Sequence, residues 1–261
     1  MTKTVIIGAG NVGFHLGKAL NDLPDAKVLQ VYSRRRGKAA KAARYIDCQY
    51  TTKLHLVNTE ADLYILAVSD GALGEVTEYF GSRPDLAEKL FVHTSGATPE
   101  TILRAHLART GVFYPLQTFS VDRRPDFSAI PFCLQARDAG DLVLLRKLAG
   151  RLSNRVEQVT DAQRAVLHVA AVFVNNFTNY LYTVGERITE TEKVDFDLLQ
   201  PLIAETARKI KNHSPRTMQT GPAVRNDTPT IERHLKYLEK FPEFRAIYTL
   251  LTEQLRRSVG G

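Results

Sequence analysis

The stretch Thr4-Val5-Ile6-Ile7-Gly8-Ala9-Gly10-Asn11-Val12-Gly13 decides the fold of this chain. Its first four residues predict a short buried strand, and residues 14–20 predict a helix directly after the glycines. A Gly-x-Gly-x-x-Gly turn between a strand and a helix is typical of a dinucleotide site. The first glycine makes the tight turn, the second lets a pyrophosphate approach the backbone, and the third lets the helix pack on the strand. The pyrophosphate lies at the positive end of the helix. The predicted contacts are Gly8, Gly10, Asn11, Val12 and Gly13.

The next predicted strand, residues 27–33, indicates which dinucleotide is bound. About 20 residues after the last glycine, an NAD site usually carries an acid that binds the ribose hydroxyls. Here that position is Ser33, and Arg34, Arg35 and Arg36 follow it. Guanidinium groups bind phosphate through paired hydrogen bonds, so the pattern favours the 2′-phosphate of NADP. Three arginines after a strand also suit a solvated loop. We predict NADP as the cofactor, with Ser33, Arg34 and Arg35 among its contacts.

Composition limits the class of protein. The chain has 261 residues, of which 44% are hydrophobic and 24% charged, as in ordinary soluble globular proteins. No apolar run approaches 18 residues, and the N-terminus enters a strand at once, so we expect neither a membrane span nor a signal peptide. The two cysteines are too few for a disulfide framework or a zinc site. The net charge of +7 comes from scattered residues, so we expect no nucleic-acid partner. A cytoplasmic protein is the plain expectation.

The order of predicted elements indicates two domains. Strand-like and helix-like runs alternate over residues 1–159, which favours a doubly wound parallel sheet, an α/β fold. Residues 160–261 are helical throughout. The predicted strands after residue 33 are 48–50, 61–68, 89–94, 111–119, 131–136 and 155–159. The predicted helices are 37–45, 73–80, 99–109 with Thr98 as cap, 141–152, a long one from Thr160 or Asp161 to 191, 197–212, 230–241 and 242–257.

Polar residues follow three of the predicted strands. In open parallel sheets, ligands bind outside the carboxyl ends of the strands. Val68-Ser69-Asp70 would face the ribose and pyrophosphate, and Thr94-Ser95-Gly96 would lie near the nicotinamide, where Gly96 permits close approach. Tyr114 and the residues after it would form a wall on the substrate side. Each of these segments also suits an ordinary turn, because Ser, Gly, Asp and Pro are common turn residues.

The long helix carries the clearest catalytic candidate. Its apolar stretch 166–180 contains His168, Asn175 and Asn179, which fall within about 40° of one another at 100° per residue. Buried polar groups need partners, so this stripe predicts either a ligand site or hydrogen bonds to neighbouring helices. Between later helices, Arg225 and Asp227 suit either an acidic substrate group or a structural contact.

These segments together resemble a known family. The GAGNVG turn, Ser-Arg after the second strand, His-Thr-Ser-Gly-Ala, Tyr-Pro-Leu-Gln-Thr-Phe and Thr-Gly-Pro-Ala-x-Arg are similar to Rossmann-like NADP oxidoreductases with a helical C-terminal domain of unknown function. Members are often labelled deazaflavin-dependent, although no motif here indicates a deazaflavin. The likeness covers nearly the whole chain. Pyrroline-carboxylate reductase, prephenate dehydrogenase and the β-hydroxyacid dehydrogenases are more distantly similar. The resemblance implies a 6-phosphogluconate-dehydrogenase-like C-terminal domain and a homodimer made through it.

Two departures limit what the resemblance implies about catalysis. The β-hydroxyacid dehydrogenases place a lysine four residues before the helix asparagine, where this chain has Ala171 and Val172. Prephenate dehydrogenases have a histidine before the proline of the substrate loop, where this chain has Tyr114. Neither role transfers to this chain.

The functional expectation is an NADP-dependent oxidoreductase. It would transfer a hydride between NADP(H) and a small keto acid, hydroxy acid or imine in the cleft between the domains, with no metal. His168 is the expected acid–base group, because histidine titrates near neutral pH. Asn175 would orient the substrate or the nicotinamide amide, and Ser95 would hydrogen-bond the reacting atom. The alternative is a catalytically silent NADP-binding sensor or interaction protein on the same fold.

Overall fold

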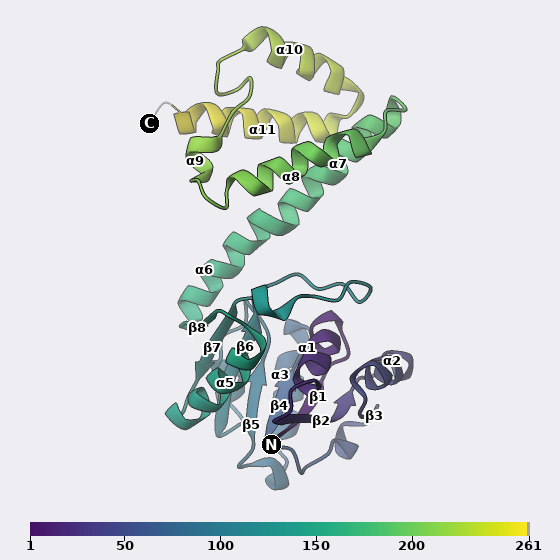
Figure 1. Ribbon diagram of the computed structural model, residues 1–261, viewed down its shortest axis with the longest axis vertical. Helices are drawn as coiled ribbons and strands as arrows, with labels where there is room; N and C mark the ends of the chain where they lie inside the picture. Colours follow the sequence, from purple (N-terminus) through teal and green to yellow (C-terminus); the bar gives the residue numbers. More distant parts are fainter. Residues whose placement is uncertain (260–261) are drawn as a thin grey trace. The chain divides into compact units, whose positions relative to one another are not determined.

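The computed structural model describes residues 1–259, and the chain divides into two compact units after Asn175. The first unit is built on a sheet (Figure 1) that has eight strands within the described residues, in the order β3-β2-β1-β4-β5-β6-β7-β8. All neighbouring strands are parallel except β6 and β7, which are antiparallel. The strands are β1 (Thr2–Ile7), β2 (Ala26–Tyr32), β3 (Gln49–Thr51), β4 (Leu63–Leu66), β5 (Leu90–His93), β6 (Arg109–Pro115), β7 (Phe132–Ala136) and β8 (Val156–Gln158).

Helices cover both faces of this sheet. On one face, α1 (Asn11–Asn21), α2 (Arg36–Ile46) and α5 (Ala139–Leu152) pack in one buried apolar cluster. On the other, α3 (Asp70–Gly81) and α4 (Thr101–Arg104) pack in a second. Strand β1 contributes Ile6 to the first cluster and Val5 and Ile7 to the second, since successive side chains of a strand point to opposite faces. The predicted doubly wound α/β fold is confirmed.

The chain order reverses beside β1, which lies between β2 and β4. At such a switch point the loops after neighbouring strands diverge and leave a crevice at the carboxyl ends. The glycine turn, Gly8 to Gly10, follows β1 at this point and leads directly into α1.

The predicted helix 99–109 is wrong over most of its length. Only Thr101–Arg104 form an α-helix, and Thr98 does not cap it, because Glu100 occupies the position before the first helical residue. Arg109 and Thr110 instead pair with Leu90 and Phe91 as the start of β6. Pairing in the sheet therefore overrides the local helical preference.

The long helix begins as predicted and then changes geometry. Thr160 caps α6 (Asp161–Ala171), because its hydroxyl accepts a hydrogen bond from the Gln163 amide at 3.2 Å while the Gln163 side chain accepts one from the Thr160 amide at 2.9 Å. Residues Val172–Phe177 are π-helical, and α7 (Thr178–Thr191) follows. A π-turn is wider than an α-turn, so the regular 100° spacing assumed for the His168–Asn175–Asn179 stripe does not hold.

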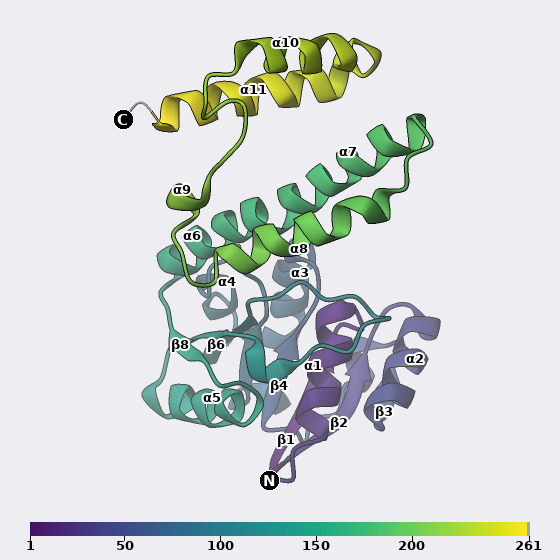
Figure 2. The same ribbon diagram turned by 45° about the horizontal axis from the view of Figure 1, so that its top comes forward.

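The second unit is helical, as predicted. After α7 come α8 (Gln200–Lys209), α9 (Pro215–Met218), α10 (Thr228–Tyr237) and α11 (Pro242–Val259). Figures 1 and 2 both show α8 beside α7 and α10 beside α11. The side chain of Glu192, just after α7, binds Lys240 at 2.8 Å and the Tyr237 hydroxyl at 3.0 Å. Ile231, Leu238 and Phe244 are buried in this unit. No helix among residues 1–259 combines the length and the apolar character needed to cross a membrane.

Candidate functional site

The glycine turn forms the floor of a cleft of about 390 Å³ in the first unit. Gly8 has φ 119°, and a Cβ there would overlap the carbonyl oxygen of Ala67. A Cβ on Gly13 would overlap the carbonyl oxygen of Gly8, so helix α1 packs against the turn only because position 13 lacks a side chain. Gly10, in contrast, faces open space. Its exposed backbone at the start of α1 fits the pyrophosphate of a dinucleotide.

The basic residues after β2 line the same cleft. Ser33, Arg34, Arg35 and Lys38 are among its lining residues, and the three basic side chains are exposed. This arrangement places several cations beside the glycine turn, as a phosphorylated ribose requires.

Glu75, on α3, lines this cleft as well and was not predicted. The pKa of Tyr32 is raised mainly by burial, lowered by the nearby Arg34 and raised by Glu75. Both charges therefore lie close to this tyrosine. Glu75 comes close to the end of β2 only because α3 folds against β4. Its position in the sequence therefore could not predict that it lines the cleft.

The other predicted cofactor residues fall into two groups. Val68 and Ser69 line the cleft, whereas Asp70 begins α3 and is absent from the lining. Val12 packs against the apolar core, and Thr94 is buried with its amide donating to the Leu66 carbonyl at 3.2 Å. Val12 therefore packs in the core, and the Thr94 backbone continues the pairing of β5 with β4.

Asn11 holds a loop. Its side-chain amide donates to the Phe119 carbonyl at 2.7 Å, and Nε2 of His15, one turn later, lies 2.8 Å from the Ser120 carbonyl oxygen. Helix α1 therefore anchors the segment after β6 through two side chains. Sequence reasoning assigned Asn11 to the cofactor and gave His15 no role.

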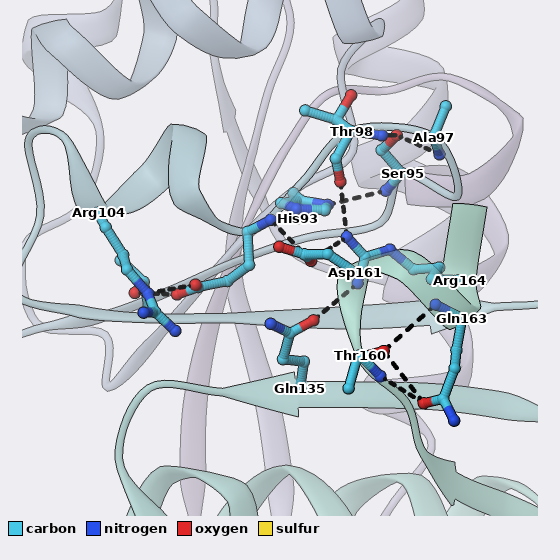
Figure 3. Close-up of polar contacts among 12 residues, drawn as sticks. His93, Ser95, Ala97, Thr98, Arg104, Gln135, Thr160, Asp161, Gln163 and Arg164 are labelled. Atoms are coloured by element: carbon cyan, nitrogen blue, oxygen red, sulfur yellow. Dashed lines mark hydrogen bonds and ion pairs between the residues drawn. The ribbon is translucent and has the colours of Figure 1, made fainter. Parts of the chain in front are cut away.

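The loop after β5 forms a second polar centre (Figure 3). Nδ1 of buried His93 accepts a hydrogen bond from the Ser95 amide at 3.1 Å. Burial lowers the pKa of His93 to about 4, so the ring is neutral at pH 7. Oγ of Ser95 accepts from the amides of Ala97 and Thr98 at 3.1 and 2.9 Å. Ser95 thus closes the turn through its hydroxyl oxygen and remains partly exposed.

Arg164 ties the start of α6 to this loop, as Figure 3 shows. Its guanidinium donates to the Thr98 carbonyl at 2.7 Å, to Asp161 at 2.7 Å and to Gln135 at 2.9 Å. Asp161 also accepts from the Glu100 amide at 3.0 Å. Arg164 is only 1% exposed, so its charge is compensated within this cluster. The i, i+3 spacing of Asp161 and Arg164 was the one sequence signal for the pair.

His168, one helical turn after Arg164, lies against Gly96. An ideal Cβ on Gly96 would stand 2.6 Å from Nδ1 of His168 and 2.8 Å from Oη of Tyr114. The structure therefore brings together the predicted residues Gly96 and His168, with Tyr114 beside them. Nδ1 of His168 is buried and has no hydrogen-bond partner among residues 1–259.

Asn175 has a different setting from the one predicted. It lies in the π-helical segment and is partly buried. Arg225, in the second unit, is exposed, and Asp227 caps α10 by accepting from the Thr230 amide at 3.2 Å. This hydrogen bond is a structural contact, one of the two roles that the sequence suggested for Asp227.

Comparison with known proteins agrees with this architecture. Residues 2–120 match the family described as a Rossmann-like domain, and residues 130–255 match DUF2520, a domain of unknown function. A solved structure described as a "putative NADP oxidoreductase" from Bacteroides fragilis is 39% identical, covers 98% of each chain and has a TM-score of 0.91. A protein from Thermotoga maritima is 21% identical over 99% of this chain and 100% of its own, with a TM-score of 0.80. No curated protein matches the chain at a significant level.

A more distant structure shares the fold. An imine reductase from Myxococcus stipitatus, solved with NADP⁺, is 17% identical over 100% of this chain and 94% of its own, with a TM-score of 0.66. The chain belongs to the oxidoreductase family in which a Rossmann-like domain precedes a DUF2520 domain.

Proposed function

We propose that this protein is an NADP(H)-dependent oxidoreductase that transfers a hydride between the cofactor and a carbon atom of a small keto acid, hydroxy acid or imine. The observation that carries the proposal is the composition of one cleft, in which the open backbone at Gly10 and the side chains of Ser33, Arg34 and Arg35 line the same cavity. The name of the Bacteroides fragilis relative and the imine reductase solved with NADP⁺ support the same class.

Different residues of the first unit would bind different parts of the cofactor and the substrate. Gly8, Gly10 and Gly13 would hold the pyrophosphate at the start of α1, and Arg34 and Arg35 would hold the 2′-phosphate. The bound cofactor supplies or accepts the hydride. His168 would move the proton at the reacting oxygen or nitrogen, Ser95 would donate a hydrogen bond, and Asn175 would orient the substrate or the nicotinamide amide.

Cofactor choice is tested by titrating the protein with NADPH and NADH and following their fluorescence. We expect tighter binding of NADPH, and a loss of about 10- to 100-fold in NADPH affinity on Arg34→Ala, because hydrogen bonds to charged groups contribute about 1.5–3 kcal/mol. Arg44→Ala is the matched control, since Arg44 is exposed on α2, the helix that follows Arg34, but does not line the cleft. Equal affinity for both dinucleotides refutes the phosphate role of the arginines.

Catalysis is tested by NADPH consumption over a set of small keto acids and cyclic imines. With a compound that is reduced, His168→Ala and His168→Gln are expected to lower kcat about 100-fold or more, the usual contribution of a general acid. If both variants keep the kcat and pH profile of the wild type, the proton comes from another group. If NADPH binds and no compound is consumed, the silent NADP-binding alternative gains support.

We also propose that the protein is a homodimer. Val166, Val169 and Val174, on α6 and the π-helical segment, are 70%, 59% and 74% exposed, and Leu198 and Leu202 in the second unit are 72% and 63% exposed. Val166 and Val169 lie three residues apart on one helix and so share a face of it, and exposed apolar side chains that share a face often mark a protein interface. Light scattering after size exclusion is expected to give twice the chain mass, and Val169→Glu to lower it. Val143→Glu is the control, because Val143, on α5, is 68% exposed and therefore at least as exposed as Val169.

A further inference from the structure

One acidic side chain lines the same cleft as the basic residues after β2. Glu75 is exposed on α3 and lines the cleft together with Arg34 and Arg35. No hydrogen bond or ion pair joins its carboxylate to another group among residues 1–259. A carboxylate repels the phosphates of a dinucleotide, so a phosphate is not what it binds. A free acceptor in this cleft instead suits a part of the ligand that carries a hydrogen-bond donor.

Tyr32 indicates where in the cleft Glu75 lies. This residue ends β2, lines the cleft and packs in the apolar cluster that α3 also enters. Burial raises the pKa of the Tyr32 hydroxyl, the charge of Arg34 lowers it and the charge of Glu75 raises it. Glu75 and Arg34 are therefore both near this hydroxyl. In the proposed function Arg34 binds the 2′-phosphate, which belongs to the adenosine half of NADP, so Glu75 lies at the adenosine end of the cleft.

Apolar side chains line the cleft as well. Ala72, Glu75 and Val76 share one face of α3, because they are three and four residues apart, and all three line the cleft. Leu54, in the segment after β3, and Val68, after β4, add further apolar surface. Apolar walls with a few polar groups that fix orientation are typical of a small-molecule site. A flat base with one donor on its edge fits this combination of apolar walls and a single carboxylate.

We propose that Glu75 recognises the adenine base of the cofactor by accepting a hydrogen bond from its 6-amino group. The inference rests on the proposed function and deepens it, because it assigns the base to a residue that binds no phosphate. An ionised carboxylate has only acceptors, and the 6-amino group is the donor on the edge of adenine. Glu75 would therefore select a dinucleotide by its base, while Arg34 and Arg35 select it by its 2′-phosphate.

The covalent structure of the cofactor supports this assignment. In the adenosine ribose, the carbon that carries the 2′-phosphate is bonded directly to the carbon that carries the base. A protein group that binds the phosphate therefore has the base as a neighbour. Arg34 and Glu75 are neighbours in the same way, since both act on the hydroxyl of Tyr32.

The test compares two ligands that differ only at the base. Full-length protein is titrated by calorimetry with NADP⁺ and with its analogue in which unsubstituted purine replaces adenine, so that a hydrogen atom replaces the 6-amino group. We expect the wild type to bind NADP⁺ about three- to tenfold more tightly, the effect of one exposed hydrogen bond. Glu75→Ala should bind both ligands within about twofold of each other. Glu78→Ala is the matched control and should keep the preference, because Glu78 is exposed on α3 but does not line the cleft.

Three results would overturn the inference. The wild type could bind both ligands equally, Glu75→Ala could keep the preference for NADP⁺, or Glu78→Ala could lose it as Glu75→Ala does. Both ligands carry the same pyrophosphate and 2′-phosphate, so these results leave the proposed function intact. If neither ligand binds to the wild type, the proposed function fails first, and the inference falls with it.

Discussion

Replacing Arg164 with methionine tests whether the cluster at the start of α6 stabilises the first unit. The side chain is 1% exposed and donates to Thr98, Asp161 and Gln135. Methionine keeps the apolar stem but leaves Asp161, which is 29% exposed, without its ion-pair partner. Removing one member of a largely buried pair typically costs about 3–5 kcal/mol. We expect a loss in this range in the free energy of unfolding.

The assay is urea denaturation at pH 7, followed by far-UV circular dichroism. Arg155→Met is the control, since Arg155 is 71% exposed and pairs with Glu157 at 3.2 Å, a contact expected to contribute less than about 1 kcal/mol. If Arg164→Met lowers the free energy of unfolding by no more than Arg155→Met does, the cluster does not stabilise the unit and does not fix His168 opposite Gly96.

Three further predictions follow from single residues. The pKa of His93 is lowered to about 4 from 6.5, so its contribution to stability is complete above pH 6.5 and is lost as the pH falls to 4. It amounts to about 3 kcal/mol, and urea titrations of His93→Gln should lack this pH dependence. Gly13→Ala should lower the free energy of unfolding by about 1–3 kcal/mol or more, because the new Cβ overlaps the Gly8 carbonyl. Gly10→Ala should lower it by less than about 1 kcal/mol, because position 10 faces open space, and should still weaken NADPH binding measured by calorimetry. Glu75→Gln should raise the NADPH-to-NADH affinity ratio about threefold or more, because it removes a carboxylate from the cleft; an unchanged ratio would place Glu75 away from the 2′-phosphate.

Local sequence patterns predicted the parts of the fold that local interactions determine. The glycine turn is recognisable because each glycine has a separate steric requirement, and the structure shows two of them in the overlaps at Gly8 and Gly13. The start of the long helix was predictable because the Thr160–Gln163 capping box lies within four consecutive residues. In both places the sequence neighbours are also the spatial neighbours.

Long-range contacts determined what the sequence did not reveal. Residues 105–109 favour a helix locally, but β5 offers Arg109 and the residues after it a sheet partner. Glu75 reaches the end of β2 only after α3 has packed, and Arg164 finds Thr98 and Gln135 only after α6 has docked on the sheet. The π-helical turn at 172–177 also changes the facing of Asn175, and no spacing rule predicts where such a turn occurs.

The central claim is that one cleft binds NADP through the glycine turn and the arginines after β2. The most direct test is a crystal structure of the protein with NADP⁺ bound. We expect the pyrophosphate over Gly10 at the start of α1 and the 2′-phosphate within hydrogen-bond distance of Arg34 or Arg35. The C4 atom of the nicotinamide should lie near Gly96. A dinucleotide bound outside this cleft, or a 2′-phosphate that points away from both arginines, would contradict the account.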